Sequence, residues 1–310
     1  MFSTDATVHA MAEAIVEAHT ATFGKADAPE GHPEFTSDDP VYRAARQACA
    51  ALGFIPIDAE CLGRAWQAQT ARTGKFEAGH WPDAPADFGL RPWPRTDTFA
   101  PCPRRLDLYA VLPDATWVAR MARAGVPTLQ LRFKSSDADA VRREIEAAVA
   151  NVQGTPSLLF VNDHWQAAID AGAYGVHLGQ EDLDALTPAE LATLRKAGLR
   201  LGVSTHGYAE MLRADACSPS YIAMGAVFPT TLKKMATAPQ GTARLKAYAR
   251  LLHNHALVAI GGIDAERMSA VLESGVGSVA VVRALTAAGD PEAAARDLQA
   301  RMRLGQAGIE

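Results

Sequence analysis

The sequence lacks the features that mark disulfide-rich, zinc-binding or membrane proteins. The 310-residue chain contains 4 cysteines, Cys49, Cys61, Cys102 and Cys217. They are widely spaced and form no CxxC pair, so we expect neither a disulfide framework nor a zinc site, and a reducing cytoplasm as the compartment. Residues 1–23 carry Asp5, Glu13 and Glu17 and no uninterrupted apolar run, which argues against a signal peptide or a membrane-spanning helix.

The chain also has no concentration of positive charge. It has 30 Lys and Arg against 35 Asp and Glu, which gives a net charge of -5, and no basic block that would suggest nucleic acid or an anionic membrane as partner. Hydrophobic residues make up 48%, as in globular proteins. We therefore expect neither nucleic acid nor a membrane as partner, and the sequence leaves a homo-oligomer open.

Residues 1–103 are predicted to form a mainly helical extension that ends in a proline-rich connector. Helical spacing of apolar residues covers 5–22, 41–52 and 59–73, with Asp58 as a candidate cap of the third helix. The connector holds six prolines, Pro82, Pro85, Pro92, Pro94, Pro101 and Pro103. So many missing backbone donors exclude a regular helix or a central strand. No catalytic group of residues is visible in this part, and its role stays open.

Residues 104–310 alternate short apolar strands with amphipathic helices. The strands are predicted at 108–112, 128–133, 157–161, 175–179, 200–204, 221–227, 257–263 and 278–285. A helical pattern follows each strand. Eight such units in about two hundred residues predict an α/β fold, a (β/α)8 TIM barrel, with an open doubly wound sheet as the alternative.

Two carboxylates leave the ends of two successive predicted strands. Asp163 follows strand 157–161, and Asp182 follows strand 175–179 through an acidic loop. In a parallel βαβ unit these two ends lie side by side, on the face where barrels build their active sites. Either aspartate could instead simply cap a helix.

The second predicted strand carries three polar side chains at alternate positions. Gln130, Arg132 and Lys134 alternate with Leu131 and Phe133, so a period of two places them on one face. Amide and cationic groups do not belong against apolar helices, and we expect them to point into the barrel mouth. A solvated strand end is the alternative for Lys134.

The remaining strand ends supply oxygen ligands, cations and glycines. They carry Asn162, Ser204, Thr205, His206, Thr230, Lys233, Gly261, Gly262 and Arg283. Hard oxygen ligands beside cations, without a His or Cys cluster, suit a diphosphate bridged to Mg²⁺. Barrels often hold a phosphate near strands 7 and 8, so the sequence indicates two phosphorylated ligands.

A series of motifs in this half resembles the thiamine phosphate synthases. The motifs are QLRFK at 130–134, ND at 162–163, GVHLGQED at 175–182, LGVSTH at 201–206, GAVFPTTLK at 225–233, APQG at 238–241 and AIGGI at 259–263. The resemblance implies a barrel transferase of thiamine biosynthesis. Such an enzyme condenses 4-amino-2-methyl-5-hydroxymethylpyrimidine diphosphate with 4-methyl-5-(2-phosphoethyl)thiazole, giving thiamine phosphate and pyrophosphate.

The resemblance also assigns roles to single residues. It implies Mg²⁺ as cofactor, with Asp163 and Asp182 as its ligands. It implies catalytic contacts to the diphosphate from Arg132, Lys134, Ser204 and Lys233. Substrate binding is implied for Gln130, Arg132, Lys134, Asn162, Ser204, Thr230, Lys233, Gly262, Val282 and Arg283.

The sequence departs from the family pattern at two places near the thiazole phosphate. Leu232 stands where a threonine is usual, and Arg283 stands where a serine is usual. Three other readings remain: a barrel that tautomerises the thiazole precursor, a non-catalytic regulatory homologue that binds thiamine intermediates, and a Schiff-base aldolase. A thiazole tautomerase has little use for Arg132, Lys134 and Lys233 beside two aspartates, and a Schiff-base aldolase needs an apolar pocket around its lysine.

Overall fold

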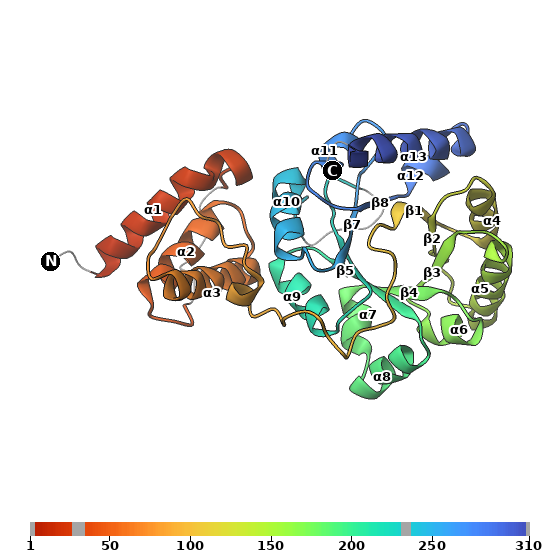
Figure 1. Cartoon of the computed structure of the whole chain (residues 1–310), viewed down its shortest axis with the longest axis horizontal. Helices are drawn as coiled ribbons and strands as arrows, with labels where there is room; N and C mark the ends of the chain where they lie inside the picture. The colour runs from red at the N-terminus through yellow and green to blue at the C-terminus, as the bar shows by residue number, and fades with distance from the viewer. Residues whose placement is uncertain (1–3, 27–34, 231–236, 308–310) are drawn as a thin grey trace. The chain divides into compact units, whose positions relative to one another are not determined.

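The computed structural model describes residues 4–26, 35–230 and 237–307, which form two compact units (Figure 1). The first unit comprises Met1–Pro94 together with Gly207–Ala216. The second comprises Arg95–His206 together with Cys217–Glu310. The segment that follows the fifth strand of the barrel thus groups with the N-terminal residues, which the predicted division into 1–103 and 104–310 does not anticipate.

The first unit is helical, as predicted for the extension. It contains α1 Thr4–Phe23, α2 Pro40–Ala51, α3 Pro56–Thr73, the short 3-10 helix η1 Pro85–Phe88 and α9 Tyr208–Ala216. Asp39 begins α2 by accepting a hydrogen bond from the Tyr42 amide at 2.9 Å. Gly74 ends α3 at φ 77°, a left-handed conformation that glycine adopts without a steric penalty.

Helix α9 is held by side chains from the N-terminal part of its own unit. Asp58 does not cap α3, which begins after Ile55, but accepts a hydrogen bond from the Ala209 amide of α9 at 2.9 Å. Trp81 donates its indole N–H to the Tyr208 hydroxyl at 3.0 Å. The Phe88 ring stacks on Tyr208 with the ring centroids 5.3 Å apart. Asp58 and Ala209 are 151 residues apart in the chain, and Trp81 and Tyr208 are 127 apart, which explains why local patterns could not reveal these contacts.

The second unit contains a closed barrel of eight parallel strands in sequence order, which confirms the predicted TIM barrel and excludes the open sheet. The strands are β1 Asp107–Leu112, β2 Thr128–Leu131, β3 Leu158–Asn162, β4 Gly175–Leu178, β5 Arg200–Thr205, β6 Tyr221–Met224, β7 Ala256–Ile260 and β8 Ser278–Val281. The last strand pairs with the first, with Asp107 opposite Ser278.

Helices follow the strands of the barrel along the chain (Figure 1). In the second unit they are α4 Ala115–Arg123, α5 Ala138–Val152, α6 Trp165–Asp170, α7 Gln180–Ala185, α8 Pro188–Lys196, α10 Gly241–Leu251, α11 Met268–Leu272, α12 Arg283–Thr286 and α13 Pro291–Ala307. Helix α7 occupies the stretch that was expected to be an acidic loop.

Several strands are shorter than their apolar runs predicted. Strand β8 ends at Val281, so Arg283 begins α12 instead of ending a strand; the apolar residues of the run do not distinguish a strand from a short helix. Strand β7 ends before Gly261 and Gly262, which adopt φ 103° and φ 66° and so leave the extended conformation. Strand β2 ends at Leu131, one residue before Arg132.

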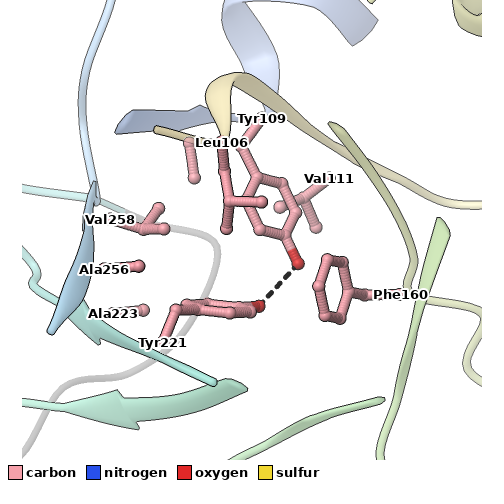
Figure 2. Packing of buried hydrophobic residues seen from close by; sticks show 9 residues of the cluster. Leu106, Tyr109, Val111, Phe160, Tyr221, Ala223, Ala256 and Val258 are labelled. Carbon is pink, nitrogen blue, oxygen red and sulfur yellow. Dashed lines mark hydrogen bonds between the residues drawn. The ribbon is translucent and has the colours of Figure 1, made fainter. Parts of the chain in front are cut away.

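Aromatic side chains fill the barrel interior (Figure 2). Tyr109 of β1 and Tyr221 of β6 lie around Phe160 of β3, with the Phe160 and Tyr221 ring centroids 5.1 Å apart. Gly202 of β5 makes room for this packing, because a Cβ there would lie 2.0 Å from Cζ of Tyr221. Within the described ranges, none of the helices is both long and apolar enough to cross a bilayer.

Candidate active site

Asp163 stands immediately after β3 in an unusual backbone conformation. Its φ is 65°, which few residues other than glycine adopt and which is often found at functional sites. Its amide donates to the His177 carbonyl of β4 at 3.0 Å, and its carbonyl accepts from the Trp165 amide at 2.8 Å. These bonds fix the side chain at the carboxyl end of β3, where its Oδ2 lies 2.6 Å from Nζ of Lys134.

Asp182 reaches the same place from the first turn of α7. Its Oδ2 accepts a hydrogen bond from the Gly179 amide at 3.3 Å, so it also caps the helix, as the alternative reading held. Partial burial raises the pKa of Asp182, and the negative charge of Asp163 and a hydrogen bond with that residue raise it further. The two predicted metal ligands are thus in contact, and their repulsion favours a cation between them.

The donor set fits a magnesium ion that draws its other ligands from a substrate. Within the described part of the chain, no cluster of three or more His, Cys, Asp or Glu side chains could hold a metal alone. Mg²⁺ is commonly held by one or two carboxylates together with substrate phosphates and water. Asp163 and Asp182 supply that number of carboxylates, and Lys134 adds a positive charge beside them.

The three polar residues predicted to share one face of β2 occupy different environments. Gln130 is only 3% exposed and lies inside the barrel, where its amide donates to the Tyr109 hydroxyl at 3.0 Å. Arg132 is half-buried, and its backbone amide still donates to the Leu112 carbonyl at 2.8 Å. Lys134 lies three residues beyond the strand and is exposed. The period of two holds for Gln130 but cannot extend past Leu131, where the strand ends.

Ser204 is held at the end of β5 by two side chains from β4 and α7. Its Oγ lies 2.7 Å from Nε2 of His177. Its backbone carbonyl accepts a hydrogen bond from Nε2 of Gln180 at 2.7 Å. Asn162, the last residue of β3, is half-buried and precedes Asp163.

The sequence did not single out three polar residues that support Ser204 and Gln130. His177, Tyr109 and Tyr221 are all buried in the barrel interior. A histidine inside the four-residue buried strand β4 was the available signal, because a buried polar side chain requires a partner. One partner of His177 is the Tyr221 hydroxyl, 44 residues further along the chain, and the sequence pattern could not predict it.

The residues expected to hold the second phosphate follow β6, β7 and β8. A Cβ on Gly262 would lie 2.7 Å from the Pro229 carbonyl, so only glycine fits there. The Gly262 carbonyl accepts a hydrogen bond from Arg267 at 2.6 Å. Thr230 and Val282 are half-buried and Arg283 is exposed. Leu232 and Lys233 lie outside the described residues.

The barrel matches a known family over most of its length. The sequence model described as thiamine monophosphate synthase matches residues 108–285. The chain belongs to this family. The thiamine-phosphate synthase of Neisseria meningitidis serogroup A is 54% identical over 203 residues, which cover 66% of this chain and 98% of that protein.

Other relatives agree in extent and in fold. The thiamine-phosphate synthase of Serratia proteamaculans is 51% identical over 203 residues, or 66% of this chain and 94% of that protein. The structure of thiamine phosphate pyrophosphorylase from Pyrococcus furiosus aligns with a TM-score of 0.57 and 27% identity, covering 65% of this chain and 98% of that one. The family match begins at residue 108, so it does not include the N-terminal helices α1 to α3.

Proposed function

We propose that the barrel is an Mg²⁺-dependent transferase that condenses the hydroxymethylpyrimidine diphosphate with the thiazole phosphate and releases pyrophosphate. The formation of thiamine phosphate follows from membership of the family. The observation that carries the finer proposal is the contact of Asp163 with both Lys134 and Asp182 at the ends of neighbouring strands. We place the reaction in the cytoplasm, because all 4 cysteines are free thiols, as expected in a reducing compartment.

The proposed reaction needs no protein nucleophile or base. The bond between the pyrimidine methylene carbon and the diphosphate oxygen breaks, and pyrophosphate leaves with the electron pair. The thiazole nitrogen then gives its lone pair to the same carbon. The side chains of Arg132, Lys134 and Ser204 would bind and orient the diphosphate, and Lys233 joins them by the family resemblance. Orientation and charge stabilisation of this kind account for large parts of enzymatic rate enhancements.

The two carboxylates define where the cofactor would be held. Asp163 and Asp182 would bind Mg²⁺, and the ion would neutralise negative charge on the departing diphosphate. The exposed ammonium of Lys134 is paired with a carboxylate, which supports a role in charge neutralisation. It gives no support to a Schiff-base aldolase, which requires an apolar lysine pocket.

We assign the thiazole phosphate to the segments after β6, β7 and β8. Thr230, Gly262 and the pair Val282 and Arg283 are the residues that the family resemblance places there. Gly262 adopts φ 66°, and the guanidinium of Arg283 could contact two phosphate oxygens at once. We propose that Arg283 compensates for the hydroxyl that Leu232 lacks.

The proposal is tested by assaying purified protein with both substrates and Mg²⁺, with thiamine phosphate detected after oxidation to a fluorescent product. Asp163→Asn should reduce turnover by about 100-fold or more, because several kcal/mol of charge stabilisation would be lost. Asp139→Asn, at an exposed aspartate paired with Arg142, is the matched control and should leave turnover unchanged. Undiminished turnover of the Asp163 variant, or of the wild-type protein in EDTA, contradicts the proposal.

A further inference from the structure

A continuous chain of hydrogen bonds crosses the barrel interior and ends at Ser204. Nε2 of Gln130 donates to the Tyr109 hydroxyl at 3.0 Å, and the hydroxyls of Tyr109 and Tyr221 lie 2.7 Å apart (Figure 2). The Tyr221 hydroxyl lies 2.7 Å from Nδ1 of His177. Nε2 of the same ring lies 2.7 Å from Oγ of Ser204. The chain links β2, β1, β6, β4 and β5 in turn.

Tyr109 and Tyr221 lie in apolar surroundings that keep both hydroxyls neutral, so each retains a proton to donate in a hydrogen bond. Figure 2 shows both hydroxyls among Leu106, Val111 and Phe160. Burial raises the pKa of both Tyr109 and Tyr221, so neither ionises near neutral pH. A buried hydroxyl without a partner is costly, so each proton must have an acceptor.

This requirement gives the chain one direction. The oxygen of Tyr109 accepts from the Gln130 amide, and the described residues offer its own proton one acceptor, the Tyr221 oxygen. Tyr221 then donates to Nδ1 of His177, so the ring proton must be on Nε2, which donates to Ser204. With Nε2 of Gln130 facing Tyr109, as the structure has it, the opposite direction would leave the Tyr109 proton buried without an acceptor.

We propose that Tyr109, Tyr221 and His177 are positioning residues that, in this direction, make the Ser204 hydroxyl a hydrogen-bond donor toward the diphosphate. Because Oγ of Ser204 already accepts from His177, its own proton is available to an anionic oxygen. A hydroxyl that accepts one hydrogen bond becomes a stronger donor of another. The inference rests on the proposed role of Ser204 at the diphosphate.

The first test needs no turnover. The chain contains 9 histidines, so ¹⁵N-histidine labelling with His177→Gln as the assignment variant identifies the ring nitrogens of His177. The expected result is a neutral ring that carries its proton on Nε2 and none on Nδ1. A proton on Nδ1 reverses the chain and overturns the proposal.

The second test measures the affinity for inorganic pyrophosphate with Mg²⁺ by calorimetry. Tyr221→Phe removes the central hydroxyl and keeps the ring, and should weaken binding about fivefold to tenfold, as expected for one oriented hydrogen bond to a charged group. Thr128→Val is the control. It removes an equally buried hydrogen bond, from the hydroxyl of Thr128 at the start of β2 to the Leu106 carbonyl, and Thr128 is not part of the chain that ends at Ser204. Equal effects of the two variants overturn the proposal.

Two further variants separate positioning from folding and from the function itself. Ser204→Ala should weaken pyrophosphate binding at least as much as Tyr221→Phe, and the double variant should be no weaker than Ser204→Ala alone. His177→Gln keeps a donor near the position of Nε2 and should retain more affinity than His177→Leu. Additive losses, or no loss with Ser204→Ala, overturn the proposal. Failure of the proposed function would instead appear as wild-type protein that binds pyrophosphate but forms no thiamine phosphate.

Discussion

Replacing Asp58 should destabilise the first unit more than replacing any exposed aspartate in it. Asp58 is 3% exposed, and its side chain accepts the hydrogen bond of the Ala209 amide, which is itself buried. In Asp58→Ala this donor loses its acceptor, which costs about 1–3 kcal/mol, and α9 loses a cap, which by itself costs about 0.5–2 kcal/mol. These are two descriptions of one lost bond, so we expect about 2 kcal/mol in total.

Urea unfolding monitored by tryptophan fluorescence would measure this change. Trp66 and Trp81 lie within the same unit, and Trp81 donates to Tyr208 of α9, so their emission reports on the unfolding of this part. With a denaturant dependence of about 2 kcal/mol per molar urea, the midpoint should fall by about 1 M.

Two control variants determine what is being measured. Asp58→Asn keeps an acceptor oxygen and should lose only the attraction between a carboxylate and the helix N-terminus, about 0.3–1 kcal/mol. Asp5→Ala breaks a 3.3 Å ion pair whose aspartate is 81% exposed, and should not move the midpoint measurably. If Asp58→Ala shifts the midpoint no more than Asp58→Asn, the cap does not hold α9 and the reasoning is wrong.

Three further predictions follow from the barrel. The pKa of Asp182 is raised, so at a pH below that pKa Mg²⁺ can bind only by displacing a proton. The affinity for Mg²⁺ should therefore rise as the pH passes through the pKa of Asp182 and then level off. Calorimetric titrations that give equal affinity at all pH values would contradict this. Gly202→Ala places a Cβ 2.0 Å from the Tyr221 ring, and should lower the melting temperature by about 5 °C or more, whereas an unchanged value would mean that the ring moves freely. Arg283→Ser should raise KM for the thiazole phosphate about tenfold and leave KM for the pyrimidine diphosphate nearly unchanged; equal effects on both would remove Arg283 from the phosphate site.

Local chemistry accounts for what was predicted well. Short apolar runs bounded by helical patterns placed all eight strands, since each run must be buried on both faces of a parallel sheet. The same runs misled at their ends: the predicted eighth strand includes Arg283, which lies in α12. Whether an apolar residue continues a strand or begins a helix depends on its tertiary neighbours.

The contact between the two aspartates shows how far topology can take a sequence. Asp163 and Asp182 were expected side by side because successive parallel strands end at the same edge, and they are in contact. The pairing of Asp163 with Lys134 was not expected, because it requires the turn at φ 65° that aims Asp163. Backbone conformations of this kind are stabilised by surrounding contacts.

The sequence by itself determined the barrel, the order of its strands and the residue types gathered at its carboxyl end, because strand periodicity and the rules of parallel connection act over short stretches of chain. Only the tertiary structure decided which polar groups meet inside. The bond between the hydroxyls of Tyr109 and Tyr221 spans 112 residues, and the bond from Ala209 to Asp58 spans 151. Such partners are selected when the whole chain packs, since a buried polar group must then satisfy its hydrogen bonds with whatever side chain the fold brings within reach.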